Sequence, residues 1–260
     1  MLVGALTASC SPSRANGISK TDNSTQITRS VNLTNFSAID ASHGIQVTYT
    51  PGKLSPASVT APDYVYDYLK ISVSKGTLKL GIDNKFFEHH NAFAGKVTIS
   101  VSAPEVNDFE ASSGSSINVA GALRVSGKCS FDISSGASVN CAHQLTAQKI
   151  DIEVSSGASM KAAKFDCHEL EVDLSSGASA TLAGIAADEV DAEASSGSSM
   201  KLEGKTKLFK ADTSSGASIH AGNLSAVKGN LEASSGSSIE HNTSDAVIQT
   251  DKSSTIRKKR

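Results

Sequence analysis

Residues 151–180 read DIEVSSGASMKAAKFDCHELEVDLSSGASA and contain the tripeptide Ser-Ser-Gly twice, 20 residues apart. The tripeptide occurs seven times in the chain, and successive glycines are separated by 22, 21, 20, 20, 19 and 20 residues. These glycines are Gly114, Gly136, Gly157, Gly177, Gly197, Gly216 and Gly236. Such even spacing indicates a solenoid in which each unit stacks on the next.

The residues on either side of each tripeptide alternate between apolar and polar. The positions five before, three before and three after the glycine are mainly apolar; around Gly177 they are Val172, Leu174 and Ala180. Alternation with a period of two is typical of strands, whereas a helix needs apolar spacings of three and four. The interior of each unit is therefore predicted to be built from strands.

The length of the unit selects the kind of solenoid. A propeller blade needs about 40 residues or more, and the leucine-rich pattern with its asparagine is missing from the sequence. A right-handed parallel β-helix with about 20 residues per coil remains, because parallel crossovers are right-handed. The glycine is expected either to adopt a positive φ or to let neighbouring backbones approach closely. The preceding serines are expected to bond the turn backbone and to stack in a ladder.

One outward column of the predicted β-helix is acidic in every unit. Four residues before each repeat glycine stand Glu110, Asp132, Glu153, Asp173, Glu193, Asp212 and Glu232. In-register stacking would place neighbouring carboxylates about 5 Å apart, where they repel each other even in water. We expect a charged exposed face that prevents aggregation, and we keep a weak site for divalent cations or basic ligands as the alternative.

The chain divides into four predicted segments. Residues 1–25 form a leader and a polar linker, and residues 26–104 form a β-rich head with a different rhythm, including a helical turn capped by Asp63 and a surface loop at 84–95. Residues 105–245 form the repeat β-helix of seven coils. Residues 246–260 form a terminal strand and a frayed basic tail.

The first ten residues resemble the end of a bacterial lipoprotein signal. An apolar stretch from Met1 ends at Ala8-Ser9-Cys10, so Cys10 is the predicted site of lipid attachment. Contact with the membrane is expected through this anchor alone. The remaining cysteines, Cys129, Cys141 and Cys167, have no metal-binding spacing and are expected to be buried thiols.

The head resembles a known family. Its motifs are Phe36, Ile39, Ser42, Gly44-Ile45 and Val47, then Ala61-Pro62, Leu69, Val73 and Gly76-Thr77-Leu78, then Val97, Ile99 and Val101, followed by the Ser-Ser-Gly repeats. This order is similar to the auto-transporter adhesin "head GIN" family of Bacteroidetes-type envelopes. The resemblance implies a β-helical protein of the cell envelope, either surface-exposed or an outer-membrane lipoprotein.

No catalytic or cofactor-binding constellation emerges from the sequence. His89-His90 with Glu88 is the only histidine cluster, and a solvated loop explains it better than a metal site. The net charge of −2 argues against a nucleic-acid partner. We therefore expect a non-catalytic adhesin-like or structural binding protein with a glycan or protein ligand and no cofactor. The alternatives are a carbohydrate-active β-helix enzyme and a periplasmic sensory or scaffold module.

Overall fold

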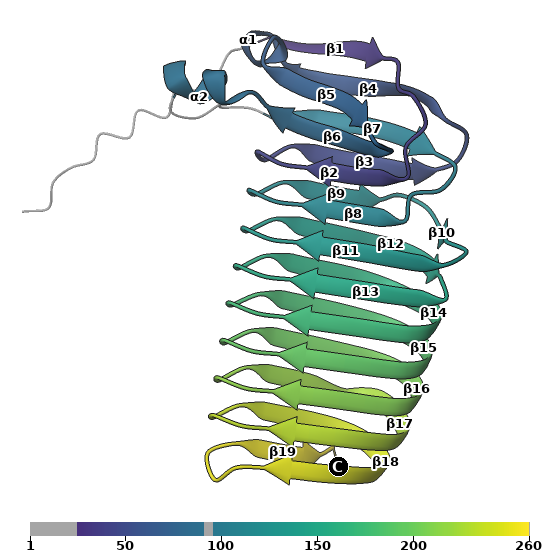
Figure 1. The fold of residues 1–260 in the computed structure, drawn as a ribbon, viewed down its shortest axis with the longest axis vertical. Helices are drawn as coiled ribbons and strands as arrows, with labels where there is room; N and C mark the ends of the chain where they lie inside the picture. Colours follow the sequence, from purple (N-terminus) through teal and green to yellow (C-terminus); the bar gives the residue numbers. More distant parts are fainter. Residues whose placement is uncertain (1–24, 91–95, 260) are drawn as a thin grey trace, which may run out of the picture.

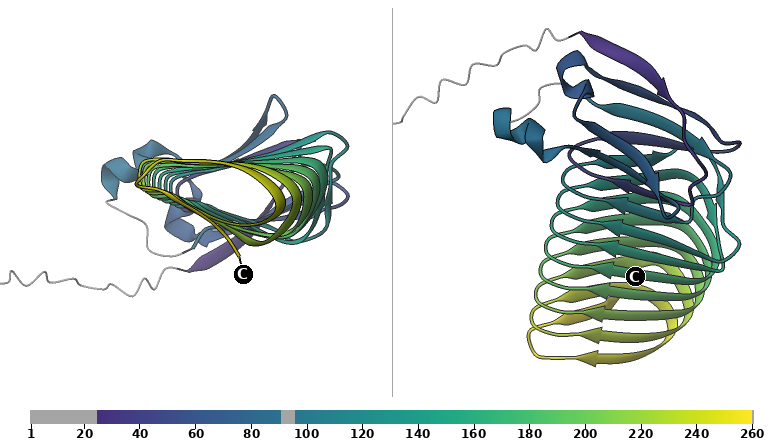
Figure 2. Two further views of the ribbon diagram at one scale, coloured as in Figure 1. Left: turned by 90° about the horizontal axis from the view of Figure 1, so that it is seen from below. Right: turned by 45° about the horizontal axis from the view of Figure 1, so that its top comes forward.

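The computed structural model describes residues 25–90 and 96–259, which form an all-β right-handed parallel β-helix of about eight turns (Figure 1). About 20 residues make one coil, as the repeat predicts. Seen from below, the coils are flattened, with a sharp corner on one side and a rounded corner on the other (Figure 2). The predicted fold class is therefore confirmed.

Each coil contributes strands to two opposing faces. The pre-turn face precedes the sharp corner and consists of β6 (Thr77–Ile82), β2 (Ala38–Ala41), β8 (Asp108–Ala111), β11 (Lys128–Ile133), β13 (Lys149–Val154) and the second halves of β14 to β18. The post-turn face consists of β7 (Thr98–Ala103), β3 (Gln46–Pro51), β9 (Ser116–Val119), β12 (Ser138–Thr146), the first halves of β14 to β18 and β19 (Thr255–Lys258).

The later coils continue round the rounded corner as single long strands. They are β14 (Ser159–Leu174), β15 (Ser179–Ala194), β16 (Ser199–Thr213), β17 (Ser218–Ala233) and β18 (Ser238–Thr250), and the short β10 (Leu123–Arg124) pairs with β12. Irregularities of pairing fall at this corner, for example between Leu182 and Ile185 and between Ala221 and Ser225. Differences in coil length are absorbed there, which explains the repeat intervals of 19 to 22 residues.

Every Ser-Ser-Gly tripeptide forms the same sharp turn. In the first copy, Ser113 and Gly114 have φ values of 50° and 72°, and the amide of Ser115 donates to the carbonyl of Ser112 at 3.0 Å. Two successive positive φ values are the signature of a type I′ turn. A Cβ atom added at Gly114 would meet nothing within 4 Å. The glycine therefore supplies the positive φ, and the expectation of close backbone approach is wrong.

Hydrogen bonds join successive turns along the axis. The amide of Gly114 donates to the carbonyl of Ser135 in the next coil at 3.0 Å. Side-chain bonds come from the serine that follows the glycine: Ser198 Oγ donates to the Leu174 carbonyl at 3.1 Å, and Ser115 Oγ donates to the Ala41 carbonyl at 2.8 Å. The predicted ladder of preceding serines is thus replaced by backbone hydrogen bonds between successive turns. In the coils that have a serine after the glycine, such as Ser115 and Ser198, its buried hydroxyl adds a further bond.

The head contains a coil that the sequence did not reveal. His43 and Gly44 have φ values of 59° and 71°, and the amide of Gly44 donates to the carbonyl of Ser113 at 3.0 Å. β2 and β3, on either side of this turn, pair in parallel with β8 and β9. The coil stack therefore extends into the predicted head without a break in strand pairing.

The other head elements cap the first end of the solenoid. β6 and β7 pair in parallel with β2 and β3 on the side away from β8 and β9. β4 (Ser55–Pro62), β5 (Leu69–Ser74) and β1 (Gln26–Val31) then add antiparallel strands. The order along the axis thus differs from the order along the chain (Figure 1).

Three local expectations are wrong. α1 (Asp63–Tyr66) is capped by Pro62 with no side-chain bond, so Asp63 lies inside the helix. Part of the predicted loop is a second helix, α2 (Asn84–His89), because Asp83 caps it and Phe86 is completely buried. The basic end forms β19, paired in parallel with β18, instead of a frayed tail.

The interior is filled by columns of like residues. The column five positions before each glycine begins with Phe109 and Phe131, whose rings stack at 4.9 Å with an angle of 7° between them. Each side chain covers its counterpart in the neighbouring coil, which buries the core with few large rings. Cys129 and Cys141 are buried as expected, and Cys167 is half-buried. No helix in the described residues is long and apolar enough to cross a membrane.

Candidate functional site

The acidic column is one continuous ladder of carboxylates. The structure pairs its seven members in successive coils: Glu110, Asp132, Glu153, Asp173, Glu193, Asp212 and Glu232. Asp40 of β2 pairs with Glu110 and extends the ladder into the head. Lys79 ends it on one side, with its Nζ 3.9 Å from the Asp40 carboxylate, and Gln249 ends it on the other.

Asp40 is the member that the sequence prediction missed. It stands four residues before Gly44, as the other acids stand four residues before their glycines. Aligning Ser42-His43-Gly44 with Ser-Ser-Gly would have identified it.

The ladder differs from the acidic column beside it in its ion pairing. Among the residues that the structure describes, none of the seven predicted acids lies within 4 Å of a lysine, arginine or histidine nitrogen, whereas Asp151 in the neighbouring column contacts Lys128 and Lys149. Lys149 also reaches Glu169 and Glu171, at 2.9 and 2.6 Å. Lysines thus offset the repulsion in the neighbouring column, whereas the ladder, among the described residues, has such a partner only at its end, where Lys79 meets Asp40.

Burial and like charges raise the pKa values of carboxyl groups in the ladder. Partial burial, followed by the charge of Glu193, raises the pKa of Asp173 from its ordinary 3.8 to about 6. Burial, with Asp40 and Asp132 nearby, also raises the pKa of Glu110. Both effects disfavour the charged form. Asp173 and Glu110 therefore hold their charge at a cost to the folded state.

A groove follows the middle of the ladder. It is lined by five of the acids and by the first serines of the adjacent turns: Asp132, Glu153, Asp173, Glu193, Asp212, Ser155, Ser175, Ser195 and Ser214. In the described part of the chain, no three metal-ligating side chains are grouped so that they could hold an ion. Binding of cations to the ladder stays a prediction.

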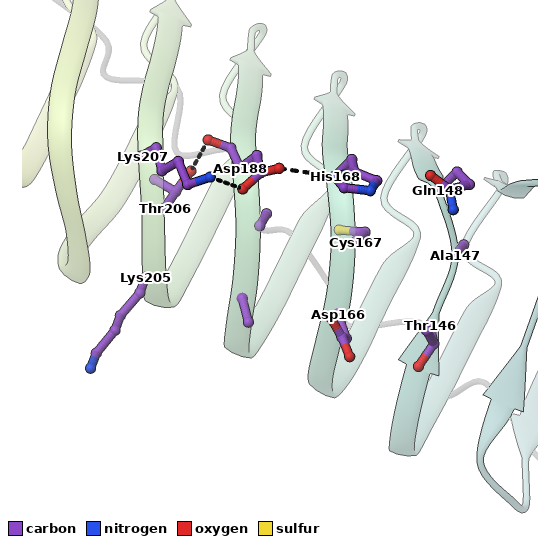
Figure 3. A pocket seen from close by; sticks show the side chains of 12 residues that line it. Thr146, Ala147, Gln148, Asp166, Cys167, His168, Asp188, Lys205, Thr206 and Lys207 are labelled. Atoms are coloured by element: carbon purple, nitrogen blue, oxygen red, sulfur yellow. Dashed lines mark hydrogen bonds and ion pairs between the residues drawn. The ribbon is translucent and has the colours of Figure 1, made fainter.

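A second hollow lies at the rounded corner and crosses four coils (Figure 3). Asp188 stands at its centre: its carboxylate is 2.8 Å from Nδ1 of His168 and 2.7 Å from Nζ of Lys207. The lysine, and then the histidine, hold the pKa of Asp188 below its usual range. His168 and Lys207 are largely exposed and Asp188 is nearly half exposed, so these pairs add little to stability.

The cysteine in this hollow is not an activated nucleophile. Burial raises the pKa of the Cys167 thiol to about 12, so the thiol stays protonated. Asp188 is shared between His168 and Lys207, and Thr206 donates its hydroxyl to backbone carbonyls at 3.0 and 3.1 Å. The hollow thus presents a protonated thiol beside side chains of both charges.

Two other features singled out in the sequence are the His89-His90 pair, for which a solvated loop is predicted, and Cys10. The His90 ring stacks on Phe86 at 4.4 Å, and its Nδ1 lies 3.1 Å from the Phe86 carbonyl, so this ring is held by the head. Cys10, the predicted site of lipid attachment, lies outside the described residues.

Together these features define a class: a β-solenoid whose pre-turn face repeats an outward carboxylate coil after coil. Within that class, the description "Putative auto-transporter adhesin, head GIN domain" matches residues 35–186 and 163–257. The chain belongs to this family, as the resemblance of its head indicated. No curated protein matches the chain.

Solved structures share the fold at low sequence identity. A "putative lipid binding protein" from Parabacteroides distasonis has a TM-score of 0.80 at 14% identity, covering 92% of this chain and 98% of that one. A "putative adhesin" from Parabacteroides merdae has a TM-score of 0.71 at 15% identity, with the same coverage. Another, from Bacteroides fragilis, has a TM-score of 0.65 at 18% identity and covers 90% of this chain and 97% of that one.

Proposed function

We propose that this chain is a non-catalytic, adhesin-like binding protein of the bacterial cell envelope. The observation that carries the proposal is the uniformity of the solenoid: the same outward chemistry recurs at each coil from Asp40 to Glu232. Solenoids use such extended surfaces to bind long or repetitive partners. The description of the family supports the same function.

The two alternative functions, a carbohydrate-active enzyme and a sensory or scaffold module, fit the outward faces less well. A carbohydrate-active enzyme needs an irregular cleft that places an acid and a base at one point. The ladder is regular instead, and the hollow at the rounded corner holds a protonated Cys167 and an ionised Asp188 that is paired with Lys207 and His168. A sensory module needs an element that transmits a signal, and nothing on either face favours one.

The anchor and the fold together suggest how the protein is displayed. β1, the first described strand, lies at the capped end of the solenoid, and the last coil lies at the opposite end (Figure 1). A lipid on Cys10 would attach the capped end to a membrane. The coils would then project away from the membrane, so that both faces could meet an extracellular glycan or protein.

A binding screen tests the proposed function. The purified chain is applied to a glycan array and to a panel of extracellular matrix proteins, beside the variant Asp173→Asn/Glu193→Gln and the control Asp67→Asn, an exposed residue at the end of α1. Saturable binding to one class of ligand is expected. Cleavage of a glycan, measured as new reducing ends, would support the enzyme instead. Absence of binding across both panels would contradict the adhesin-like function.

A further inference from the structure

The last described coil has a strand that is paired along one side only, whereas its counterparts in the preceding coils are paired along both sides. The end segment, residues 246–250 of β18, pairs on one side with residues 229–233 of β17. In the described residues, no strand pairs with its other side. Ile248 is 46% exposed, while its counterparts Leu231 and Ala211 are 0% and 4% exposed. Among the described residues, no strand covers Ile248 on this side.

The end segment also lacks the charges that its position carries elsewhere. The corresponding five residues contain at least one charged side chain in each of the seven Ser-Ser-Gly coils, as in Val190-Asp191-Ala192-Glu193-Ala194, whereas the end segment is Ala246-Val247-Ile248-Gln249-Thr250. Val247 occupies the column of Asp191 and is 62% exposed, and Gln249 occupies the column of the carboxylate ladder. Exposed edge strands normally carry charges that prevent pairing. The end segment carries no charged side chain.

The other edge of the last coil is protected in the usual way. β19 forms that edge, and its Arg257 and Lys258 are exposed. Basic side chains on an edge strand oppose pairing with another strand. A partner strand is therefore expected to pair with the end segment and not with β19.

We propose that the end segment pairs antiparallel with the end segment of a second copy of this chain, joining two solenoids end to end. A two-fold axis at Val247 places Val247 opposite its own copy, Ala246 opposite Ile248, and Gln249 opposite Asp245, which precedes the end segment in β18. No two carboxylates then face each other. In four of the seven Ser-Ser-Gly coils the residue in the column of Val247 is an acid, such as Asp191, and in this register it would face its own copy. The uncharged Val247 removes that repulsion, which points to a second copy as the partner. Opposite-facing like charges destabilise antiparallel pairs. This inference is independent of the ligand that the faces bind.

Sedimentation equilibrium of the full chain with Cys10→Ala tests the proposal, over concentrations from about 10 µM to about 1 mM. The wild-type surface should form a reversible dimer. The variant Val247→Asp/Gln249→Glu restores the residue types of the other coils and should therefore fold. It should weaken the dimer about tenfold or more, and high salt should recover part of the loss.

A control and a cross-link make the outcome decisive. Val227 is 58% exposed but lies at the rounded corner of the preceding coil, so Val227→Asp should leave the dimer unchanged. Val247→Cys should yield a disulfide-linked dimer on oxidation, because opposed Cβ atoms in an antiparallel pair are close enough for a disulfide. A wild-type chain that stays monomeric throughout overturns the proposal. So does a dimer that the restored charges do not weaken, or one that Val227→Asp disrupts equally.

Discussion

Asp173→Asn should stabilise the protein at neutral pH. Asp173 sits in the middle of the carboxylate ladder, with Glu153 and Glu193 paired on either side. No cation lies within 4 Å of its carboxylate among the described residues. The amide of asparagine has the same shape and carries no charge, so the substitution removes repulsion and leaves packing intact.

The pKa of Asp173 gives the size and the sign of the effect. A rise from 3.8 to about 6 corresponds to about 3 kcal/mol of differential free energy. Contact with solvent reduces this to about 1–2 kcal/mol. Because the folded pKa is raised, the contribution of Asp173 to stability is fully present below the unfolded value of 3.8 and is lost as pH rises through about 6.

Thermal melting at pH 7 and at pH 3.5 measures both the gain and its pH dependence. At pH 7 the variant should melt about 3–6 °C above the wild type, and at pH 3.5 the two should coincide. Asp188→Asn serves as the matched control, because the pKa of Asp188 is lowered by Lys207 and His168. It should give no gain at pH 7. If Asp173→Asn melts below the wild type at pH 7, or if its gain persists at pH 3.5, the repulsion argument fails.

Three further predictions concern the turns, the ladder and the anchor. Gly177→Ala should lower the melting temperature, because alanine is forced into a φ of 71° at a cost of about 1–2 kcal/mol. Ser176→Gly should raise the melting temperature, because glycine adopts the φ of 52° without strain. Equal melting temperatures for the two variants would contradict the type I′ turn. If the ladder binds calcium, millimolar calcium should raise the melting temperature of the wild type at pH 7, and Asp173→Asn/Glu193→Gln should abolish that rise. A wild-type melting temperature that calcium does not change would leave only the interpretation of the ladder as a charged face that prevents aggregation. Cys10→Ala should move the protein from the membrane fraction to the soluble fraction; a variant that stays membrane-bound, beside a wild type that takes up no lipid label, would refute the lipoprotein prediction.

The coil interior could be predicted because strand periodicity and repeat spacing point to the same structure. Apolar residues such as Val172 and Leu174 alternate with outward acids, and a parallel β-helix stacks each residue on its counterpart. The register of the ladder followed from the same spacing, since Glu110 to Glu232 all lie four residues before a turn glycine. Both predictions are confirmed by the strand pairing.

The coil formed by β2 and β3 was hidden for two reasons. The turn geometry restricts the glycine strictly, but the residue before it only needs to tolerate a left-handed conformation, so His43 can replace the serine. Residues 52–103 then separate this coil from the next and interrupt the period. Two strands of this stretch, β6 and β7, stack on the far side of β2 and β3, an order along the axis that sequence spacing does not encode.

The hollow at the rounded corner follows the repeat more closely than its varied residues suggest. His168, Asp188 and Lys207 each lie nine residues before the next turn glycine. In-register stacking therefore places them in neighbouring coils side by side, as the strand pairing around them shows. The residue type at this position changes from coil to coil, so no repeated letter marks the ion pairs that form there.

Adhesion of cells that display the chain tests the central claim most directly. Cells expressing the wild type are applied to a surface coated with the ligand that the binding screen identifies, and retained cells are counted after washing. The adhesin-like function predicts strong retention, inhibition by the soluble chain, and loss of retention when Cys10→Ala detaches the protein from the envelope. Equal retention of cells with and without the displayed chain would contradict it.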